Sequence, residues 1–505
     1  MRKIASIGFI AANILAAALL IWCRSEASVA GNAAMLFCLG IIALDLLYIA
    51  FSKNRFGLWF IVGEIALLLL CHYPRQAAST DLGNMTSVSV VAAVAMIAMP
   101  LLAVPFFVLE LRGIGRDAKP WPTPLRQLRP FVAPALLVGL LALAFLGYDS
   151  VYNYGYSAHE FTTTRADYLL LGVIFMVSCL FLNLFIGDKE GTWREYLRRN
   201  IALLTVFAAL SGFGLSCFLR SYTSVKGDAA AAEQDYAAMF GESSADYDGD
   251  ARAVPLSLPE LLFGIRNDDN YTIEFDKVYT TIDEGPFAGL RLAYDAYLPA
   301  DPGAHRSAVV MLHGSGQDKS GVDTPQRNKY LASKGYAVYT LQVGDWNEAN
   351  TNYPKDVPRD WEFMLGNLDR FFAYATEHED ANFDSVFLMG SSMGGFLLTD
   401  YLYNFEHKYQ EYGVKIRGLV PLYGVNGNAE IDSESLPALI YVGDHDGYVN
   451  VGDVYALREK YREAGNKNAI ALTVSYGGHS CDIEFNSRGG QLEIYFLERF
   501  FGKLR

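Results

Sequence analysis

Apolar residues are spread unevenly along the chain, and this unevenness divides it into two halves. Up to about residue 220 they form long unbroken runs, whereas beyond it they alternate with polar residues as in a soluble domain. A helix that crosses a bilayer needs about 20 consecutive apolar residues. Seven runs in series reach or approach that length, which predicts a bundle of about seven transmembrane helices over residues 4–23, 30–51, 57–71, 88–111, 131–146, 168–187 and 201–219.

Lysine and arginine collect in alternate loops between these runs, and this alternation predicts the orientation of the bundle. Basic residues are frequent at the start of the chain and after the second, fourth and sixth runs, whereas the other loops hold only Arg24, Arg75 and Arg165. Basic side chains resist translocation, so the basic loops are cytoplasmic. The N-terminus is then inside, and after seven crossings everything beyond Arg220 lies outside the cytoplasmic membrane.

Beyond residue 270 the pattern changes to short segments typical of strands and helices. Residues 271–280 and 289–298 alternate as an antiparallel pair, whereas 308–312 is continuously apolar and suits a strand covered on both faces. Strands that alternate with helices predict a mainly parallel sheet with helices on both faces. Further strands are expected at 336–342, 385–388, 416–421, 438–442 and 469–475, and helices at 326–334, 359–377, 396–402, 453–463 and 492–501.

These patterns divide the chain into a multi-pass transmembrane domain (1–220), an acidic linker (221–262) and an α/β domain (263–505). The linker is expected because residues 221–253 are mostly small and acidic, apart from a short helical piece at 229–240. Residues 1–220 hold 17 of the 41 basic and 12 of the 55 acidic residues, which leaves a net charge of −19 for the rest. So acidic a surface argues against binding nucleic acid.

The stretch Gly390-Ser391-Ser392-Met393-Gly394 joins an expected strand to an expected helix. In that setting the pattern G-x-S-x-G marks a nucleophile elbow, which is a sharp turn that exposes a serine hydroxyl at the end of a strand. Glycines are needed there because the strand and the helix approach closely. Only Ser392 fits the register of the pattern, and we therefore predict that Ser392 is a nucleophile.

A serine hydroxyl needs a base, usually a histidine that a carboxylate orients. In sheets with a nucleophile elbow the order along the chain is serine, acid, histidine. Asp444 and Asp446 follow the strand expected at 438–442, and His479 follows the strand expected at 469–475. Residue types, order and strand ends agree, so we predict that His479 is the base and that one of the two aspartates orients it.

Two further features suit an acyl-transfer site. A developing oxyanion needs backbone N–H donors, and we expect them from Met393, directly after the nucleophile, and from Ser315, in a glycine turn after the strand at 308–312. Residues 344–361 form a long connection that carries Trp346 and Tyr353. We interpret it either as a lid whose aromatic residues bind substrate or as a packed surface loop.

Residues 271–505 resemble the α/β-hydrolase fold and, within it, the dienelactone-hydrolase and acyl-esterase group. The resemblance rests on His313-Gly314-Ser315-Gly316, Gly390-Ser391-Ser392-Met393-Gly394-Gly395, Gly443-Asp444-His445-Asp446-Gly447-Tyr448-Val449 and Tyr476-Gly477-Gly478-His479. The acid loop of such proteins commonly reads G-x-x-D-x-x-V, which implies that Asp446 rather than Asp444 orients His479. The resemblance also implies ester hydrolysis through an acyl-enzyme, without metal or organic cofactor. Dienelactone hydrolases carry a cysteine nucleophile where this chain has Ser392, so the lactone substrate is not transferred.

The expected function is that of a membrane-anchored serine hydrolase that cleaves an acyl ester outside the cytoplasmic membrane. Its expected partners are a small-molecule or lipid-linked acyl substrate and the lipid bilayer; which proteins it binds is not readable from the sequence. One alternative is an acyltransferase with the same triad, in which an acceptor alcohol replaces water. The other is a ligand-binding or sensor protein with a hydrolase-like outer domain, although binding alone gives no reason for a complete triad.

Two acidic residues lie well inside apolar runs, where ionisable groups are rare and often functional. Asp45 precedes and Glu64 follows the same basic loop by nearly equal numbers of residues. The helical hairpin therefore puts them at matching depth. We interpret the pair either as a hydrogen bond between two helices or as a proton or cation site coupled to the hydrolase.

Overall fold

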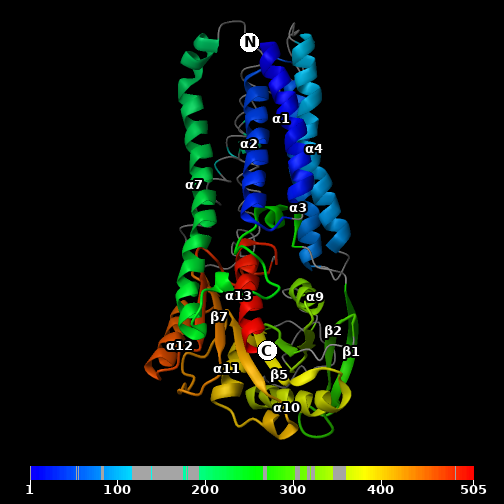
Figure 1. Cartoon of the computed structure of the whole chain (residues 1–505), viewed down its shortest axis with the longest axis vertical. Helices are drawn as coiled ribbons and strands as arrows, with labels where there is room; N and C mark the ends of the chain where they lie inside the picture. The colour runs from blue at the N-terminus through cyan, green and yellow to red at the C-terminus, as the bar shows by residue number, and fades with distance from the viewer. Residues whose placement is uncertain are drawn as a thin grey trace.

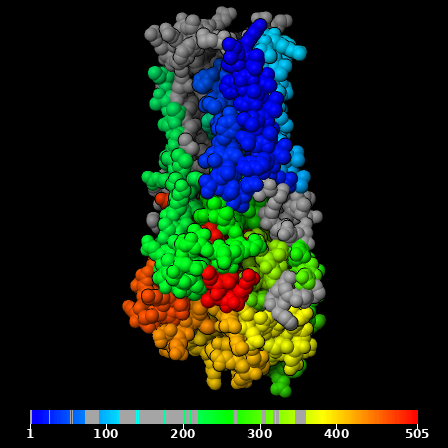
Figure 2. All heavy atoms as spheres, viewed as in Figure 1, coloured from blue at the N-terminus to red at the C-terminus, as the bar shows by residue number. Residues whose placement is uncertain are grey.

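The computed structural model describes residues 2–115, 138, 141, 175–177, 179 and 193–505, except for 25, 53, 55, 81–84, 266–269, 302–306, 316–318, 320–324, 345–359 and 484. The molecule is elongated, with a helical bundle above a broader α/β domain (Figures 1 and 2). The N-terminus lies at the end of the bundle that is far from the α/β domain (Figure 1).

The bundle contains α1 (Arg2–Cys23), α2 (Val29–Phe51), α3 (Gly57–Thr80) and α4 (Met85–Arg112). Among the described residues, three stretches are long and apolar enough to cross a membrane, namely Lys3–Cys23, Val29–Phe51 and Val90–Arg112, and the apolar part of α3, Gly57–Cys71, is shorter. Large apolar side chains cover the outside of the bundle; Ile4, Trp59 and Val94 are 75%, 65% and 61% exposed. Exposed apolar surface on this scale is typical of a protein that contacts lipid, so the helices indicate association with a membrane.

The structure describes less of the other expected membrane helices. The runs at 131–146 and 168–187 lie almost wholly outside the described residues, and the run at 201–219 is part of α7 (Trp193–Phe240). A bundle of seven crossings therefore stays a prediction. Asp45 of α2 and Glu64 of α3, the two acids expected inside the bundle, are each only 3% exposed.

The structure differs from the expected linker, because α7 continues without a break to Phe240. This helix has 48 residues, and at about 1.5 Å per residue it is roughly 72 Å long. It runs beside the bundle and then along the α/β domain (Figure 1). The acidic residues that suggested a solvated linker are instead partners of the α/β domain: Asp235 pairs with Arg458 at 2.7 Å, and Asp228 accepts hydrogen bonds from Ser475.

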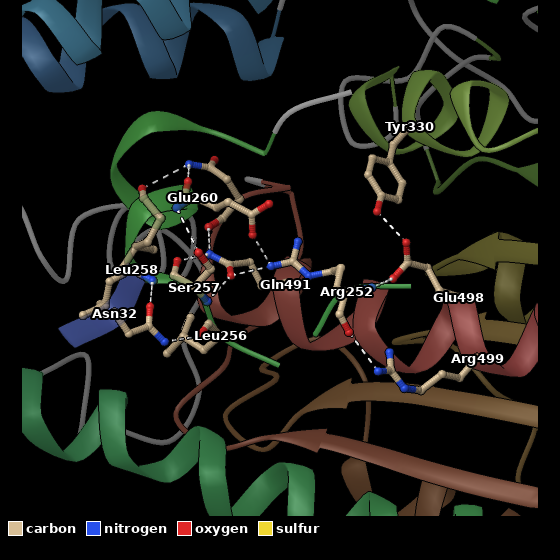
Figure 3. A network of polar contacts seen from close by, with 12 residues as sticks. Asn32, Arg252, Leu256, Ser257, Leu258, Glu260, Tyr330, Gln491, Glu498 and Arg499 are labelled. Atoms are coloured by element: carbon tan, nitrogen blue, oxygen red, sulfur yellow. Dashed lines mark hydrogen bonds and ion pairs between the residues drawn. The ribbon is translucent and has the colours of Figure 1, made fainter. Parts of the chain in front are cut away.

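After α7 the chain forms η1 (Ser244–Asp246) and the short helix α8 (Leu258–Phe263), which joins the two halves. Leu258, Leu261 and Phe263 of α8 pack in the hydrophobic core of the bundle. Asn32, in the first turn of α2, donates to the carbonyl of Leu256 at 2.9 Å and accepts from the N–H of Leu258 at 2.6 Å (Figure 3). The bundle and the α/β domain are thus connected by packed and hydrogen-bonded contacts.

The α/β domain contains one sheet of eight strands in the order β1-β2-β4-β3-β5-β6-β7-β8. The strands β1 and β2 pair antiparallel, β2 is also antiparallel to β4, and the remaining neighbours are parallel. The mainly parallel sheet that the sequence predicts is therefore confirmed. The strands are β1 (Tyr271–Thr281), β2 (Arg291–Pro299), β3 (Ser307–Leu312), β4 (Ala337–Leu341), β5 (Asn382–Ser391), β6 (Ile416–Leu422), β7 (Ala438–Gly443) and β8 (Ala469–Val474).

Helices cover both faces of this sheet. Tyr339 of β4 packs on Phe371, with ring centroids 5.7 Å apart, whereas Phe387 of β5 packs on Phe501 at 4.1 Å. The strand register aligns Tyr339 with Leu388, so Phe387, the residue before it, points to the opposite face. The helices are α9 (Pro325–Ser333), α10 (Trp361–His378), α11 (Met393–Tyr403), η2 (Tyr409–Tyr412), α12 (Val451–Glu463) and α13 (Arg488–Leu504).

Candidate active site

Ser392 forms the sharp turn between β5 and α11. Its backbone has φ of 52° and ψ of −116°, a left-handed conformation that costs a non-glycine residue about 1–3 kcal/mol. The turn is held on both sides, since the Ser392 N–H donates to the carbonyl of Leu422 at 2.8 Å and its carbonyl accepts from Phe396 at 3.2 Å. The strained serine therefore stands between the strand and the start of the helix, as the elbow pattern predicts.

Close backbone contacts explain the glycines around this turn. A Cβ atom on Gly390 would come within 2.5 Å of the carbonyl of Gly394, and one on Gly394 would come within 2.5 Å of the Leu312 oxygen. A Cβ atom on Gly424, in the loop after β6, would overlap the carbonyl of Ser392. The elbow thus needs glycine both in its own sequence and in a neighbouring loop.

The structure brings Ser392, His479 and Asp446 together in one hydrogen-bonded chain. The Nε2 atom of His479 lies 3.1 Å from Oγ of Ser392, and its Nδ1 atom lies 2.8 Å from Oδ2 of Asp446. The other carboxylate oxygen of Asp446 accepts from the N–H groups of Tyr448 and Val449, both at 2.8 Å. The carboxylate is therefore fixed in the acid loop, with the imidazole between it and the serine.

Asp444 has a different position from Asp446. Its Oδ1 atom accepts from the N–H of Tyr476 at 2.6 Å and lies 2.5 Å from Nδ1 of His445. It therefore links the acid loop to the turn that precedes His479, which we call the histidine turn (residues 475–478). Of the two aspartates that the sequence offers, the one joined to the imidazole is Asp446.

Of the two expected oxyanion donors, Met393 is part of the elbow itself, whereas Ser315 comes from the loop after β3, which approaches the elbow. Met393 is the first residue of α11, where backbone N–H groups have no partner inside the helix. Ser315 is exposed and follows His313, whose carbonyl lies beside Gly394 at the start of α11. Trp346 and Tyr353, the expected substrate-binding residues, lie outside the described residues.

Two aromatic residues that the sequence analysis missed contact His479. Tyr423 packs edge-on against the imidazole at 4.8 Å, and Tyr448 lies at 5.1 Å and is 60% exposed. Tyr423 is buried and has a positive φ of 40°. It directly follows β6, just as Ser392 follows β5, so its place at a strand end was the signal that could have identified it.

Side chains from distant parts of the chain hold the histidine turn. Asp228 of α7 accepts from the N–H and the Oγ of Ser475, at 3.0 and 2.6 Å. Arg488 donates to the carbonyl of Ser475 and, at 2.8 Å, to that of Tyr476. Burial raises the pKa of Asp228, and the hydrogen bonds from Ser475 oppose that shift. No local motif around Asp228 could have predicted this contact.

The residues that follow His479 are packed against a buried ion cluster. Arg327 of α9 is 1% exposed and pairs with Asp482 and, at 2.9 Å, with Glu493 of α13. Burial raises the pKa of the neighbouring Cys481 thiol far above its ordinary range, and the charge of Asp482 adds to the shift. The thiol is therefore held protonated and serves as a packed side chain. Among the described residues, histidine, cysteine and acidic side chains form no cluster suited to a metal ion.

Comparison with known proteins gives matches among solved structures only. No family model and no curated protein matches the chain. Esterase 2 of the planctomycete Thermogutta terrifontis with bound butyrate is 15% identical, with 46% of this chain and 91% of that chain covered and a TM-score of 0.35. The same esterase phosphonylated by cyclosarin is 16% identical, with 45% and 89% covered and a TM-score of 0.35. A protein of Klebsiella pneumoniae subsp. pneumoniae described as a dienelactone hydrolase is 14% identical, with 46% and 99% covered and a TM-score of 0.35. Similarity at this level assigns neither substrate nor mechanism to this chain.

Proposed function

We propose that this chain is a membrane-anchored serine hydrolase that cleaves an acyl ester through Ser392, His479 and Asp446. The observation that carries the proposal is the position of His479, which hydrogen-bonds the strained serine at 3.1 Å and the aspartate at 2.8 Å. A base between a serine hydroxyl and a fixed carboxylate is the arrangement that activates the hydroxyl for attack on an acyl carbon. A domain that only binds a ligand has no need of it.

In the proposed reaction Oγ of Ser392 attacks the ester carbonyl while Nε2 of His479 takes the hydroxyl proton. The Asp446 carboxylate stabilises the imidazolium that results. The tetrahedral intermediate collapses to an acyl-enzyme, and His479 gives its proton to the departing alcohol. Water then attacks the acyl carbon with His479 again as base, which releases the acid and regenerates the serine.

Backbone N–H groups at the start of α11 suit the developing oxyanion. Met393 offers its N–H at the positive end of the helix dipole, directly beside the attacked carbon. We assign the second donor to Ser315, because the end of β3 approaches the elbow at Leu312 and His313. The apolar helices anchor the enzyme in the membrane, and the basic loops of the sequence favour an outer location for the α/β domain.

Ester turnover by matched serine variants tests this function. The full chain, purified in lipid nanodiscs, is given p-nitrophenyl butyrate, a short water-soluble ester. Ser392→Ala should lower kcat by about three orders of magnitude or more, as removal of a triad serine does. Ser391→Ala is the control, because Ser391 is fully buried beside it and its hydroxyl has no hydrogen-bond partner among the described residues. Retained turnover in Ser392→Ala, with loss in Ser391→Ala, contradicts the assignment.

A further inference from the structure

The strand that leads to His479 runs toward the bundle. Along α7, which passes from the bundle into the α/β domain, Asp228 comes before Asp235. Asp235 accepts from the N–H of Ala471 near the start of β8 at 3.2 Å, and Asp228 accepts from Ser475 just beyond its end at 3.0 Å. Strand and helix therefore run in opposite directions, and β8 brings the histidine turn to the end of the domain that is close to the bundle.

The distance from the histidine turn to the bundle is short. Tyr222 of α7 packs against both the core of the bundle and the core of the α/β domain, so it marks the junction. Asp228 follows it by six residues, which is about 9 Å of helix. Because Asp228 holds Ser475 directly, the turn before His479 lies about 9 Å beyond that junction, measured along α7.

A second contact, made by a residue that follows His479 in the chain, also leads to the end of the bundle. Asn486 donates to the carbonyls of Glu260 and Leu261 in α8, both at 3.2 Å. That helix packs in the bundle core, and Asn32 ties the segment before it to the first turn of α2 (Figure 3). This turn begins the stretch Val29–Phe51, which is long and apolar enough to cross a membrane. His479 thus lies between two contacts at the end of the bundle, where a membrane surface would be.

The contacts of α7 with the α/β domain also fix how far the site lies from the end of the bundle. A flexible linker would let the domain move freely in solution, but α7 is a continuous helix of 48 residues whose Asp228 and Asp235 are buried in contacts with the domain. Exposed aromatic residues lie on both sides of the junction: Trp22 near the end of α1 is 46% exposed, and Tyr448 beside His479 in the α/β domain is 60% exposed. Tryptophan and tyrosine prefer the interface between membrane and water.

We propose that the ester cleaved by this site is carried at head-group level by a lipid of the adjacent leaflet, whose chains stay in the bilayer during the reaction. The inference rests on the proposed function and adds the class of substrate. A hydrocarbon core about 30 Å thick is flanked on each side by a head-group layer of roughly 5–8 Å. A turn about 9 Å beyond the junction lies at the outer edge of that layer, so it is close to a head-group ester without extraction of the lipid. Residues 221–505 carry a net charge of −19, which favours an uncharged or zwitterionic head group over an anionic one.

Surface dilution tests the inference with one fluorogenic ester in two forms. The full chain is reconstituted in phosphatidylcholine vesicles with umbelliferyl butyrate, either free in solution or attached by a short spacer to the head group of phosphatidylethanolamine. At a constant total amount of ester, the phosphatidylcholine is increased tenfold. The rate on the attached ester should fall by about tenfold below saturation, because the enzyme meets it at its surface concentration, and the rate on the free ester should not change.

The two proposals fail in different ways in this experiment. Cleavage of the free ester without cleavage of the attached one contradicts the lipid substrate and leaves the hydrolase intact. A rate on the attached ester that does not change when phosphatidylcholine is increased also contradicts the inference, because the site then takes its substrate from bulk solution. Loss of both activities, with no labelling of Ser392 by a fluorophosphonate, would instead remove the proposed function itself.

Discussion

Replacing Asp228 by alanine tests whether the helix that leaves the bundle also positions the proposed base. The Asp228 carboxylate accepts two hydrogen bonds from Ser475, at 3.0 and 2.6 Å. Hydrogen bonds to a charged group contribute about 1.5–3 kcal/mol each. Burial raises the pKa of this carboxyl, because the buried carboxylate has lost hydration, and that loss offsets part of the gain. We therefore expect Asp228→Ala to destabilise the native conformation of the histidine turn by about 2–3 kcal/mol.

If this free energy is lost from the orientation of His479, kcat/KM falls by about 30- to 160-fold, since 1.36 kcal/mol corresponds to a factor of ten. The loss should appear in kcat, because Asp228 contacts the histidine turn rather than the substrate. The assay measures kcat and KM for p-nitrophenyl butyrate with the full chain in nanodiscs, together with its thermal unfolding. Asp228→Asn should restore part of kcat, because its amide oxygen can still accept a hydrogen bond.

Asp235→Ala is the matched control for this variant. Asp235 lies on the same helix and binds Arg458 at 2.7 Å and the N–H of Ala471 at 3.2 Å, near the start of β8. Its removal should weaken the packing of α7 on the α/β domain to a similar extent and leave kcat close to the wild-type value. Equal losses of kcat in both variants, or none in Asp228→Ala, would refute a positioning role for Asp228 and reduce its contact to a structural one.

Three further predictions concern the acid loop, the elbow and pH. Asp446→Asn should lose most of kcat because the imidazole is no longer held in the productive tautomer, whereas Asp444→Asn should lose little; the reverse order in ester turnover would show that the acid is misassigned. Gly424→Ala should abolish ester turnover, because its Cβ overlaps the carbonyl of Ser392. Gly366→Ala should keep full activity and gain up to about 1 kcal/mol in stability, because among the described residues its Cβ meets only a side-chain atom, at 3.7 Å. A raised folded-state pKa means that the carboxyl of Asp228 contributes most stability below the unfolded value of about 3.9 and less as pH rises through the folded value. The stability of the wild type relative to Asp228→Asn, measured by denaturant unfolding, should therefore decrease as pH rises above about 4, and an increase would contradict the sign of the shift.

The α/β domain could be predicted from the sequence because its elements have strong local patterns. Residues 308–312 and 438–442 are continuously apolar, as strands covered on both faces must be, and the structure has β3 and β7 there. Ser392 and His479, which lie 3.1 Å apart in the structure, could be singled out because each comes after an expected strand. The choice between Asp444 and Asp446 needed the family resemblance, since both residues follow the same strand.

The course of α7 was not predictable from local composition. Residues 221–240 are poor in large apolar side chains, which is typical of a linker. The structure shows that Ala232 and Tyr236 of this segment are fully buried and that Asp228 and Asp235 have partners more than 200 residues away. Only the folded domain supplies those partners. Tyr423 is a different case, because its place just after an expected strand was a usable signal, but nothing in the sequence indicates its contact with His479.

Labelling of intact cells with a membrane-impermeant fluorophosphonate tests the central claim most directly, because it examines the nucleophile and the side of the membrane together. In cells that express the full chain, the reagent should label it without permeabilisation. The label should disappear in Ser392→Ala and persist in Ser391→Ala. Labelling that appears only after permeabilisation would place the α/β domain inside the cell, and persistent labelling of Ser392→Ala would show that another residue is the nucleophile.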